Sequence, residues 1–150
     1  MILAAQPLAA SGFELCMPTR WHDNDCYGHV NNVIYYSYFD TAVNEFLIRR
    51  CGLDIHNGPV IGLVVESSCR YHESISFPQR VLVHACVERL GRTSATYSIS
   101  LRIEGRETIA ARGRFAHVYV SRETRRPVPI PDAMRAALSE VMCSPLEGQA

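Results

Sequence analysis

The feature that most constrains the fold is a stretch of eighteen residues, 33–50, that contains neither Gly nor Pro. Apolar and aromatic side chains recur in it at intervals of three and four, which places them on one face of an α-helix: Tyr36, Phe39, Val43 and Phe46, widened by Tyr35, Tyr38, Ala42 and Leu47. Arg49, Arg50 and Gly52 form a typical helix C-terminus. A face this broad predicts a long helix that the rest of the protein largely covers.

A polar loop, residues 22–31, runs directly into the start of this helix. Asn31 or Asn32 is the expected N-cap, because an Asn side chain accepts a hydrogen bond from the first turn. A helix N-terminus presents free N–H groups and a partial positive charge. Asp25 precedes the helix by enough residues for the loop to fold back and place its carboxylate beside those groups. Such a site could polarise an ester or thioester carbonyl while the carboxylate attacks it or activates water.

Other interpretations of the loop stay open at this point. Asp23 and Asp25 could only bond the loop backbone, as Asp residues in turns usually do. A metal could be held by the loop's acidic and imidazole side chains, although their spacing matches no zinc pattern and no metal is expected: His22, Asp23, Asp25 and His29. Cys26 could be a nucleophile with a neighbouring His as its base, or a small buried hydrophobe. Gly28 indicates a positive φ or a close backbone approach.

The remainder of the chain indicates a sheet and a second, shorter helix. Strands are expected at 13–21, 60–72, 80–90, 94–103 and 107–121, and a helix at 132–142. Pro18 confines the first strand to an edge or a bulge. Alternation in the second strand places Leu63, Val65, Cys69 and Tyr71 on one face. We expect an α+β fold in which the last four strands form an antiparallel meander and the long helix packs on the concave face of the sheet.

Length and composition bound the organisation and the setting. At 150 residues with 47% hydrophobic residues, we expect one domain over 13–143, a flexible arm over 1–12 and a frayed tail over 144–150. A net charge of zero argues against general nucleic-acid or anionic-membrane surfaces, and no stretch is long and apolar enough to span a bilayer. The six cysteines lack C-x-x-C spacing, and no secretory signal is evident, so we expect free thiols in a reducing cytoplasm.

Residues 23–35 resemble the 4-hydroxybenzoyl-CoA thioesterase family of hotdog-fold proteins. The family pattern D-x-D-x-x-G-H-V-N-N-x-x-Y is matched at each fixed position: Asp23, Asp25, Gly28, His29, Val30, Asn31, Asn32 and Tyr35. The run at 125–131 also resembles that family, and the resemblance extends over roughly 13–140. It implies a hotdog fold, an antiparallel sheet of five or so strands wrapped around one long helix. It also implies a homodimer with its sheets joined edge to edge and active sites at the interface, or a homotetramer of such dimers.

The activity implied by the resemblance is hydrolysis of an acyl-CoA thioester to a free acid and CoA, with no metal or organic cofactor. Asp25 would act as nucleophile or general base, and the backbone amide near Asn32 would polarise the carbonyl. The acyl site is expected to involve Tyr27, Gly28, His29, Val33 and Tyr36. CoA is expected to contact Arg92, Thr93 and Ser94 after the hairpin glycine. Some relatives place the working carboxylate on the long helix, where this chain has Asp40 and Glu45.

Three alternatives share this fold. An acyl-carrier-protein thioesterase would need a basic surface for an acidic carrier, for which Arg122, Arg125 and Arg126 are candidates. A hydratase or dehydratase would need a His and Asp pair that the sequence does not reveal. A non-catalytic acyl-CoA-binding protein would show ligand-dependent thermal stabilisation without turnover.

Overall fold

The computed structural model describes residues 11–144. The proposed arm and tail fall mainly on residues 1–10 and 145–150, which lie outside that range. The described elements are β1 (Phe13–Pro18), a short 3-10 turn (Trp21–Asp23), α1 (Asn32–Arg50), β2 (Val60–Tyr71), β3 (Arg80–Leu90), β4 (Ser94–Ile103), β5 (Ile109–Ser121) and α2 (Asp132–Ser139). This is the expected α+β class. Neither described helix has the length and apolar character needed to cross a membrane.

The five strands form one antiparallel sheet in the order β1-β3-β4-β5-β2. β1 is an edge strand, as Pro18 predicts, but it ends at Pro18 rather than at residue 21. The expected meander of four strands is wrong in one respect, because only β3, β4 and β5 follow one another as neighbours. β1 takes the edge of β3, so β2 pairs instead with β5 at the other side of the sheet.

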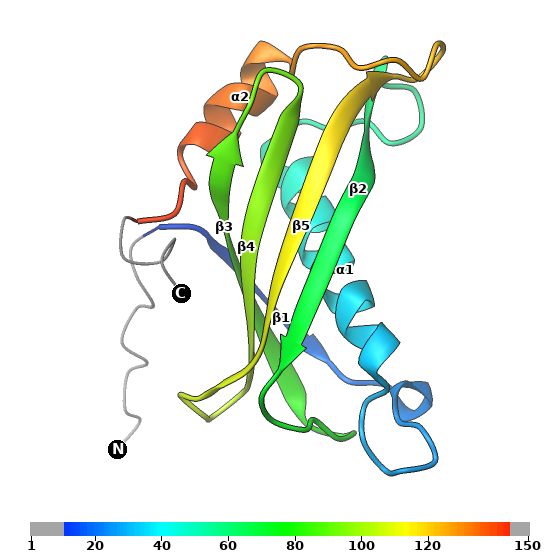
Figure 1. Cartoon of the computed structure of the whole chain (residues 1–150), viewed down its shortest axis with the longest axis vertical. Coiled ribbons are helices and arrows are strands. Elements are labelled where there is room, and N and C mark those ends of the chain that lie inside the picture. The colour runs from blue at the N-terminus through cyan, green and yellow to red at the C-terminus, as the bar shows by residue number, and fades with distance from the viewer. Residues whose placement is uncertain (1–10, 145–150) are drawn as a thin grey trace.

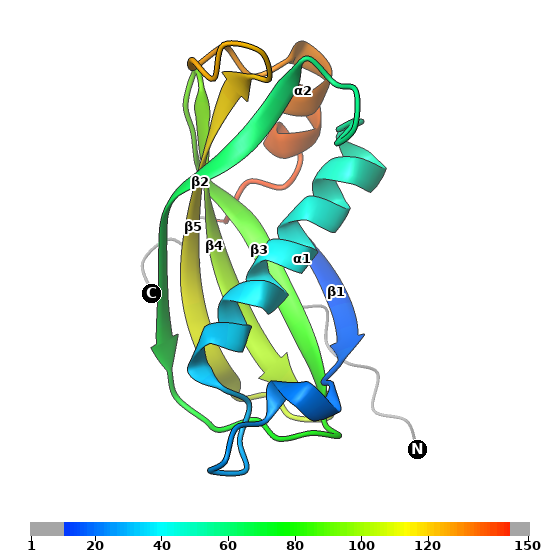
Figure 2. The same ribbon diagram turned by 90° about the vertical axis from the view of Figure 1, so that its right-hand side faces the viewer.

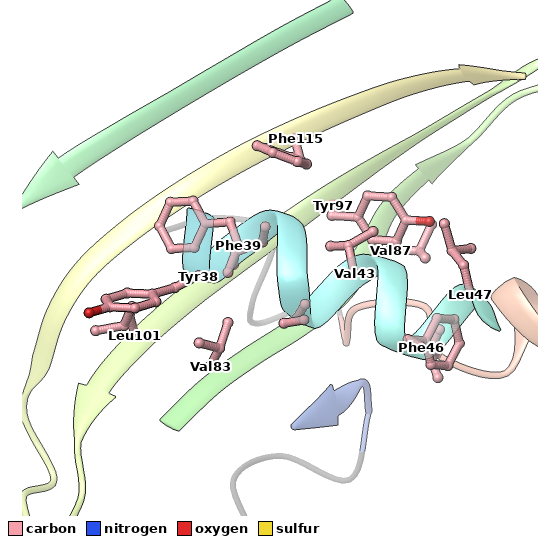
Figure 3. Close-up of a cluster of buried hydrophobic side chains, with 14 of the residues drawn as sticks. Tyr38, Phe39, Val43, Phe46, Leu47, Val83, Val87, Tyr97, Leu101 and Phe115 are labelled. Atoms are coloured by element: carbon pink, nitrogen blue, oxygen red, sulfur yellow. The ribbon is translucent and has the colours of Figure 1, made fainter. Parts of the chain in front are cut away.

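The long helix α1 lies across one face of the curved sheet (Figures 1 and 2). Its buried residues are Tyr35, Tyr38, Phe39, Ala42, Val43, Phe46 and Leu47, which follow the predicted stripe. Figure 3 shows five of them, namely Tyr38, Phe39, Val43, Phe46 and Leu47, in one cluster with strand residues such as Val83, Tyr97 and Leu101. The hydrophobic core therefore lies between α1 and the sheet, and its burial fixes the position of the first turn of α1.

The ring of Phe39 in α1 packs directly on Gly113 of β5. A Cβ atom added there would lie 2.4 Å from a ring carbon of Phe39, which is itself fully buried. We expect Gly113→Ala to lower the free energy of unfolding by about 1–3 kcal/mol through overpacking, measured by urea denaturation. Gly62→Ala is the matched control, because its Cβ would meet its nearest neighbour at 3.4 Å. Equal losses in both variants would contradict this account.

A bulge in β2 corrects the predicted faces of that strand. The pairing with β5 shifts register between Val64 and Glu66, so one residue of β2 has no partner. Val64 pairs with His117, and Tyr71 pairs with Ala111, so both lie on the face that α1 covers. Leu63 pairs with Val118 on the opposite face. The simple alternation therefore fails at Leu63 and Val65 because it assumes an unbroken strand.

His117 lies in the core with its Nδ1 atom buried and without a hydrogen-bond partner among the described residues. Burial disfavours the imidazolium and lowers the pKa of His117 from 6.5 to about 4. Between those values the unfolded chain binds more protons than the folded one. The contribution of neutral His117 to the free energy of unfolding is therefore fully present above pH 6.5. It decreases by about 3 kcal/mol as the pH falls toward 4. We expect urea unfolding of His117→Leu to show a smaller difference between pH 7 and pH 4.5 than wild type; equal differences would contradict the assignment.

A disulfide between Cys86 and Cys143 corrects the expectation that all six cysteines are free thiols. Cys16, Cys26, Cys51 and Cys69 are free. The bond holds the segment after α2 against β3, where the backbone of Val87 exchanges hydrogen bonds with Val141 and Cys143. β1 pairs with the edge of β3 only as far as Ala85, and the segment after α2 pairs with that edge beyond this point, at Val87. Among the described strands, β2 is therefore the one with a long open edge.

Candidate active site

The loop before α1 folds back on itself, as its turn residues predict. The amide of Asp25 donates to the carbonyl of His29 over 2.9 Å, and the amide of Gly28 donates to the carbonyl of Asp25 over 3.0 Å. Gly28 has φ of +82°, which confirms the sequence-based expectation for a glycine at this position. The loop thereby returns Asp25 to the start of the helix.

Asp25 is partly buried, and each of its carboxylate oxygens accepts one hydrogen bond. The backbone amide of Tyr27 donates to Oδ1 over 2.9 Å, and the side-chain amide of Asn31 donates to Oδ2 over 3.2 Å. Within residues 11–144, no Arg or His forms an ion pair with this carboxylate. Asp25 is therefore oriented by neutral donors and keeps lone pairs for a substrate or a water molecule.

The first turn of α1 leaves one amide available beside Asp25. Asn31 is the N-cap, since its Oδ1 accepts from the amide of Val33 over 3.1 Å and its carbonyl accepts from the amide of Ile34 over 2.9 Å. The amide of Asn32 has no acceptor among the hydrogen bonds of the described residues. The Asn31 side chain thus bonds both the helix start and the carboxylate: its oxygen accepts from the Val33 amide, and its nitrogen donates to Asp25.

Asp23, the first carboxylate of the loop, has a structural role. Its side chain is fully buried and accepts from Tyr38 Oη over 2.7 Å and from the Arg20 backbone over 2.8 Å. Burial alone would favour the protonated acid. The hydrogen bonds from Tyr38 and Arg20 outweigh burial and lower the pKa of Asp23, so it holds the loop as a carboxylate. Its carbonyl also accepts from the amide of Asn31, which fixes the N-cap.

A cavity of about 510 Å³ opens at this junction. Four of the predicted site residues line it together, namely Asp25, Tyr27, His29 and Asn32. The opposite wall comes from Tyr71 at the end of β2 and from the residues that follow it, including Glu73. Glu73 is held by an ion pair with Arg106 and by a hydrogen bond from Thr108 over 3.0 Å. Sequence analysis missed this wall, because nothing local relates residues 71–74 to a loop some forty residues earlier.

The other predicted substrate residues lie near the cavity without lining it. Val33 is 61% exposed on the first turn of α1, and Tyr36 is half-buried with its ring edge-on to Phe39. The carbonyl of Gly28 accepts from the hydroxyl of Ser76. Asp40 and Glu45 line a separate surface groove farther along α1, and Asp40 accepts a hydrogen bond from Asn44. The cavity therefore contains the loop carboxylate and neither helix carboxylate, and the catalytic role of Asp25 stays a prediction.

Arg92, Thr93 and Ser94 lie in the β3–β4 hairpin, at the opposite end of the sheet from the loop before α1 (Figure 1). The hairpin backbone is held by Arg135, which donates to the carbonyls of Gly91 and Arg92. Within one chain these residues do not join Asp25, so their contact with CoA stays a prediction. Cys26 is exposed, so it is not the small buried hydrophobe of one alternative for the loop. The alternative in which the two Asp residues bond the loop backbone fits Asp23 and is met in part by Asp25, whose Oδ1 accepts from the Tyr27 amide. No described group of three His, Cys, Asp or Glu residues could hold a metal ion.

Comparison with known proteins identifies the superfamily of the chain. The model of the thioesterase-like superfamily matches residues 19–138, and the chain belongs to that superfamily. No curated protein sequence matches it. Among solved structures, the PA5185 protein from Pseudomonas aeruginosa strain PAO1 is 52% identical, with a TM-score of 0.87, over 89% of this chain and 94% of that one.

Two further solved structures share the fold. One is described as a predicted thioesterase from Bacillus stearothermophilus; it is 28% identical with a TM-score of 0.77, over 89% of this chain and 98% of its own. The other, a 1,4-dihydroxy-2-naphthoyl-CoA thioesterase from Synechocystis, is 17% identical with a TM-score of 0.78, over 86% of this chain and 96% of its own. At that identity the second likeness concerns the fold alone. The resemblance found in the sequence is thus confirmed at the level of the superfamily.

Proposed function

We propose that this protein is an acyl-CoA thioesterase that hydrolyses an acyl-CoA thioester to a free acid and CoA. The observation that carries the proposal is that Asp25 and Asn32 line one cavity, and that the Asn32 amide has no acceptor among the hydrogen bonds of the described residues. Membership of the thioesterase-like superfamily supports the reaction type. The chemistry draws on these two groups and on water. The proposed location of the protein is the cytoplasm, which now rests on the acyl-CoA substrate alone, because the Cys86–Cys143 disulfide removes the free-thiol argument.

In the proposed reaction, the Asn32 amide donates a hydrogen bond to the thioester carbonyl oxygen and stabilises the negative charge that develops there. The Asp25 carboxylate either attacks the carbonyl carbon, forming an anhydride that water then hydrolyses, or removes a proton from an attacking water. In both routes the carbon–sulfur bond breaks, and the leaving CoA thiolate takes up a proton that comes from water, directly or through Asp25. The net change consumes one water molecule and yields the free acid and the CoA thiol. Tyr27 and His29 are placed to contact the substrate at the cavity mouth.

We further propose a homodimer formed through the open edge of β2. An exposed strand edge is a template for pairing with another chain, and β2 extends over twelve residues with that edge unpaired among the described strands. Leu63, Val64 and Val65 on this strand are exposed apolar side chains that pairing would cover. The dimer would place a second copy beside the α1 and β2 face on which the cavity opens. A homotetramer of such dimers is the larger alternative.

A panel of acyl-CoAs tests the proposal: short, medium and long aliphatic, benzoyl and phenylacetyl thioesters, assayed for thiol release with no added metal. Turnover of at least one class supports an acyl-CoA thioesterase. No turnover, together with a raised melting temperature in the presence of an acyl-CoA, would instead identify a binding protein. No turnover and no stabilisation, with hydrolysis of the same acyl groups on a carrier protein, would favour the carrier-protein alternative.

A further inference from the structure

Tyr71, the last residue of β2, connects the edge strand to the first turn of α1. Its hydroxyl donates a hydrogen bond to the carbonyl oxygen of Asn32 over 2.9 Å. Its ring packs edge-on against Tyr35 with the ring centroids 4.9 Å apart. Tyr71 also lines the cavity that contains Asp25 and Asn32. This contact joins residues 39 positions apart, and no sequence motif includes it.

The backbone at Asn32 and Val33 is restrained by hydrogen bonds rather than by burial of these two residues. Asn32 and Val33 are both exposed, and the helix start is held on one side by the Asn31 cap. The hydrogen bond from Tyr71 holds Asn32, which lines the cavity, from the other side through its carbonyl. Burial, followed by the neighbouring Cys69 and Tyr36, raises the pKa of Tyr71. The hydroxyl therefore keeps its proton and remains a donor at any working pH.

We propose that Tyr71 is a positioning residue: it holds the Asn32–Val33 peptide plane from β2 and, through the backbone dihedrals of Asn32, limits the directions that the Asn32 amide can take. This inference rests on the proposed thioesterase function and adds to it a residue from outside the loop and helix. A fixed amide needs no reorganisation as charge develops on the thioester oxygen, whereas a mobile one stabilises the transition state less well. Ground-state binding of the acyl-CoA depends on many other contacts, so the loss of this restraint should affect kcat more than KM.

The test is Tyr71→Phe, which removes the hydroxyl and keeps the ring against Tyr35. We expect kcat for the best acyl-CoA to fall about threefold to tenfold, the value of one hydrogen bond, while KM changes less than about twofold. Tyr119→Phe is the matched control, because it removes a buried hydroxyl that contacts only Tyr97 Oη, at 3.4 Å, away from the cavity. It should leave kcat unchanged. An unchanged kcat in Tyr71→Phe, or a raised KM with kcat unchanged, would overturn the inference.

A second measurement separates this inference from the proposed function. In two-dimensional NMR spectra of the intact protein, Tyr71→Phe should shift and broaden the backbone amide signals of Asn32 and Val33, and Tyr119→Phe should leave them in place. Unaltered signals in Tyr71→Phe would overturn the positioning role whatever the kinetics. If wild type hydrolyses no thioester, the proposed function and the catalytic part of this inference both fail. The amide signals still decide in that case whether Tyr71 holds the first turn.

Discussion

Asp25→Asn is expected to reduce thioester hydrolysis by about 10²–10⁴-fold while leaving the fold intact. The substitution keeps the size of the side chain and removes the charge, so the group can neither attack a carbonyl nor accept a proton from water. One of the two hydrogen bonds, from Tyr27 or from Asn31, is lost as well, because an Asn side chain offers one acceptor atom where Asp offers two. We expect thermal unfolding to stay close to wild type, since Asp25 is only partly buried. Initial rates of thiol release measure the effect.

Asp40→Asn and Glu45→Gln provide the controls for this prediction. They make the same chemical change on α1, at carboxylates that line a different groove from Asp25. If Asp25 supplies the chemistry, both controls keep wild-type rates. An Asp40→Asn enzyme that loses its rate while Asp25→Asn keeps it would move the reaction to the helix carboxylate and contradict the site described above.

The sequence predicted those parts of the fold that depend on neighbouring residues. Helical spacing, the Asn cap and the Arg-Arg-Cys-Gly end placed the helix at the residues that α1 occupies. The hairpin glycine marked the end of β3, and alternation placed β4 correctly. Each of these signals is local, because it comes from the backbone geometry of one element. Asp25, Tyr27, His29 and Asn32 were predicted together for the same reason, since one loop and one helix start carry them all.

The predictions that were wrong or missing concern contacts between segments that are distant in the sequence. No local pattern shows whether β2 pairs with β3 or with β5, and one bulge reverses the faces of half a strand. Cysteine spacing does not determine which thiols meet, so the pairing of Cys86 with Cys143 became visible only when the tail was placed beside β3. Tyr71 and Glu73 belong to the same group, because the sheet alone brings them to the loop.

Asn31→Asp is expected to lower kcat/KM by about 10–100-fold at neutral pH, the value of a hydrogen bond to a charged group. The Asn31 side chain has two separate contacts, since its oxygen caps α1 and its nitrogen donates to Asp25. Asp is as good an N-cap as Asn, so the helix start should persist. The side-chain nitrogen, however, is replaced by an oxygen that faces Oδ2 of Asp25. The donor is lost and two carboxylates are forced together, which turns Asp25 away from the orientation that the reaction needs.

Asn44→Asp is the matched control, because the side-chain amide of Asn44 also donates to a carboxylate, that of Asp40, over 2.9 Å. It creates the same pair of acids on α1 outside the cavity lined by Asp25, and we expect its kcat/KM to equal that of wild type. Asn31→Ser separates the two contacts further, since Ser keeps the cap and removes the donor without adding charge. Its kcat/KM should fall between those of wild type and Asn31→Asp. If Asn31→Asp and Asn44→Asp lose activity equally, the effect comes from added negative charge in general, and the contact between Asn31 and Asp25 has no special part in catalysis.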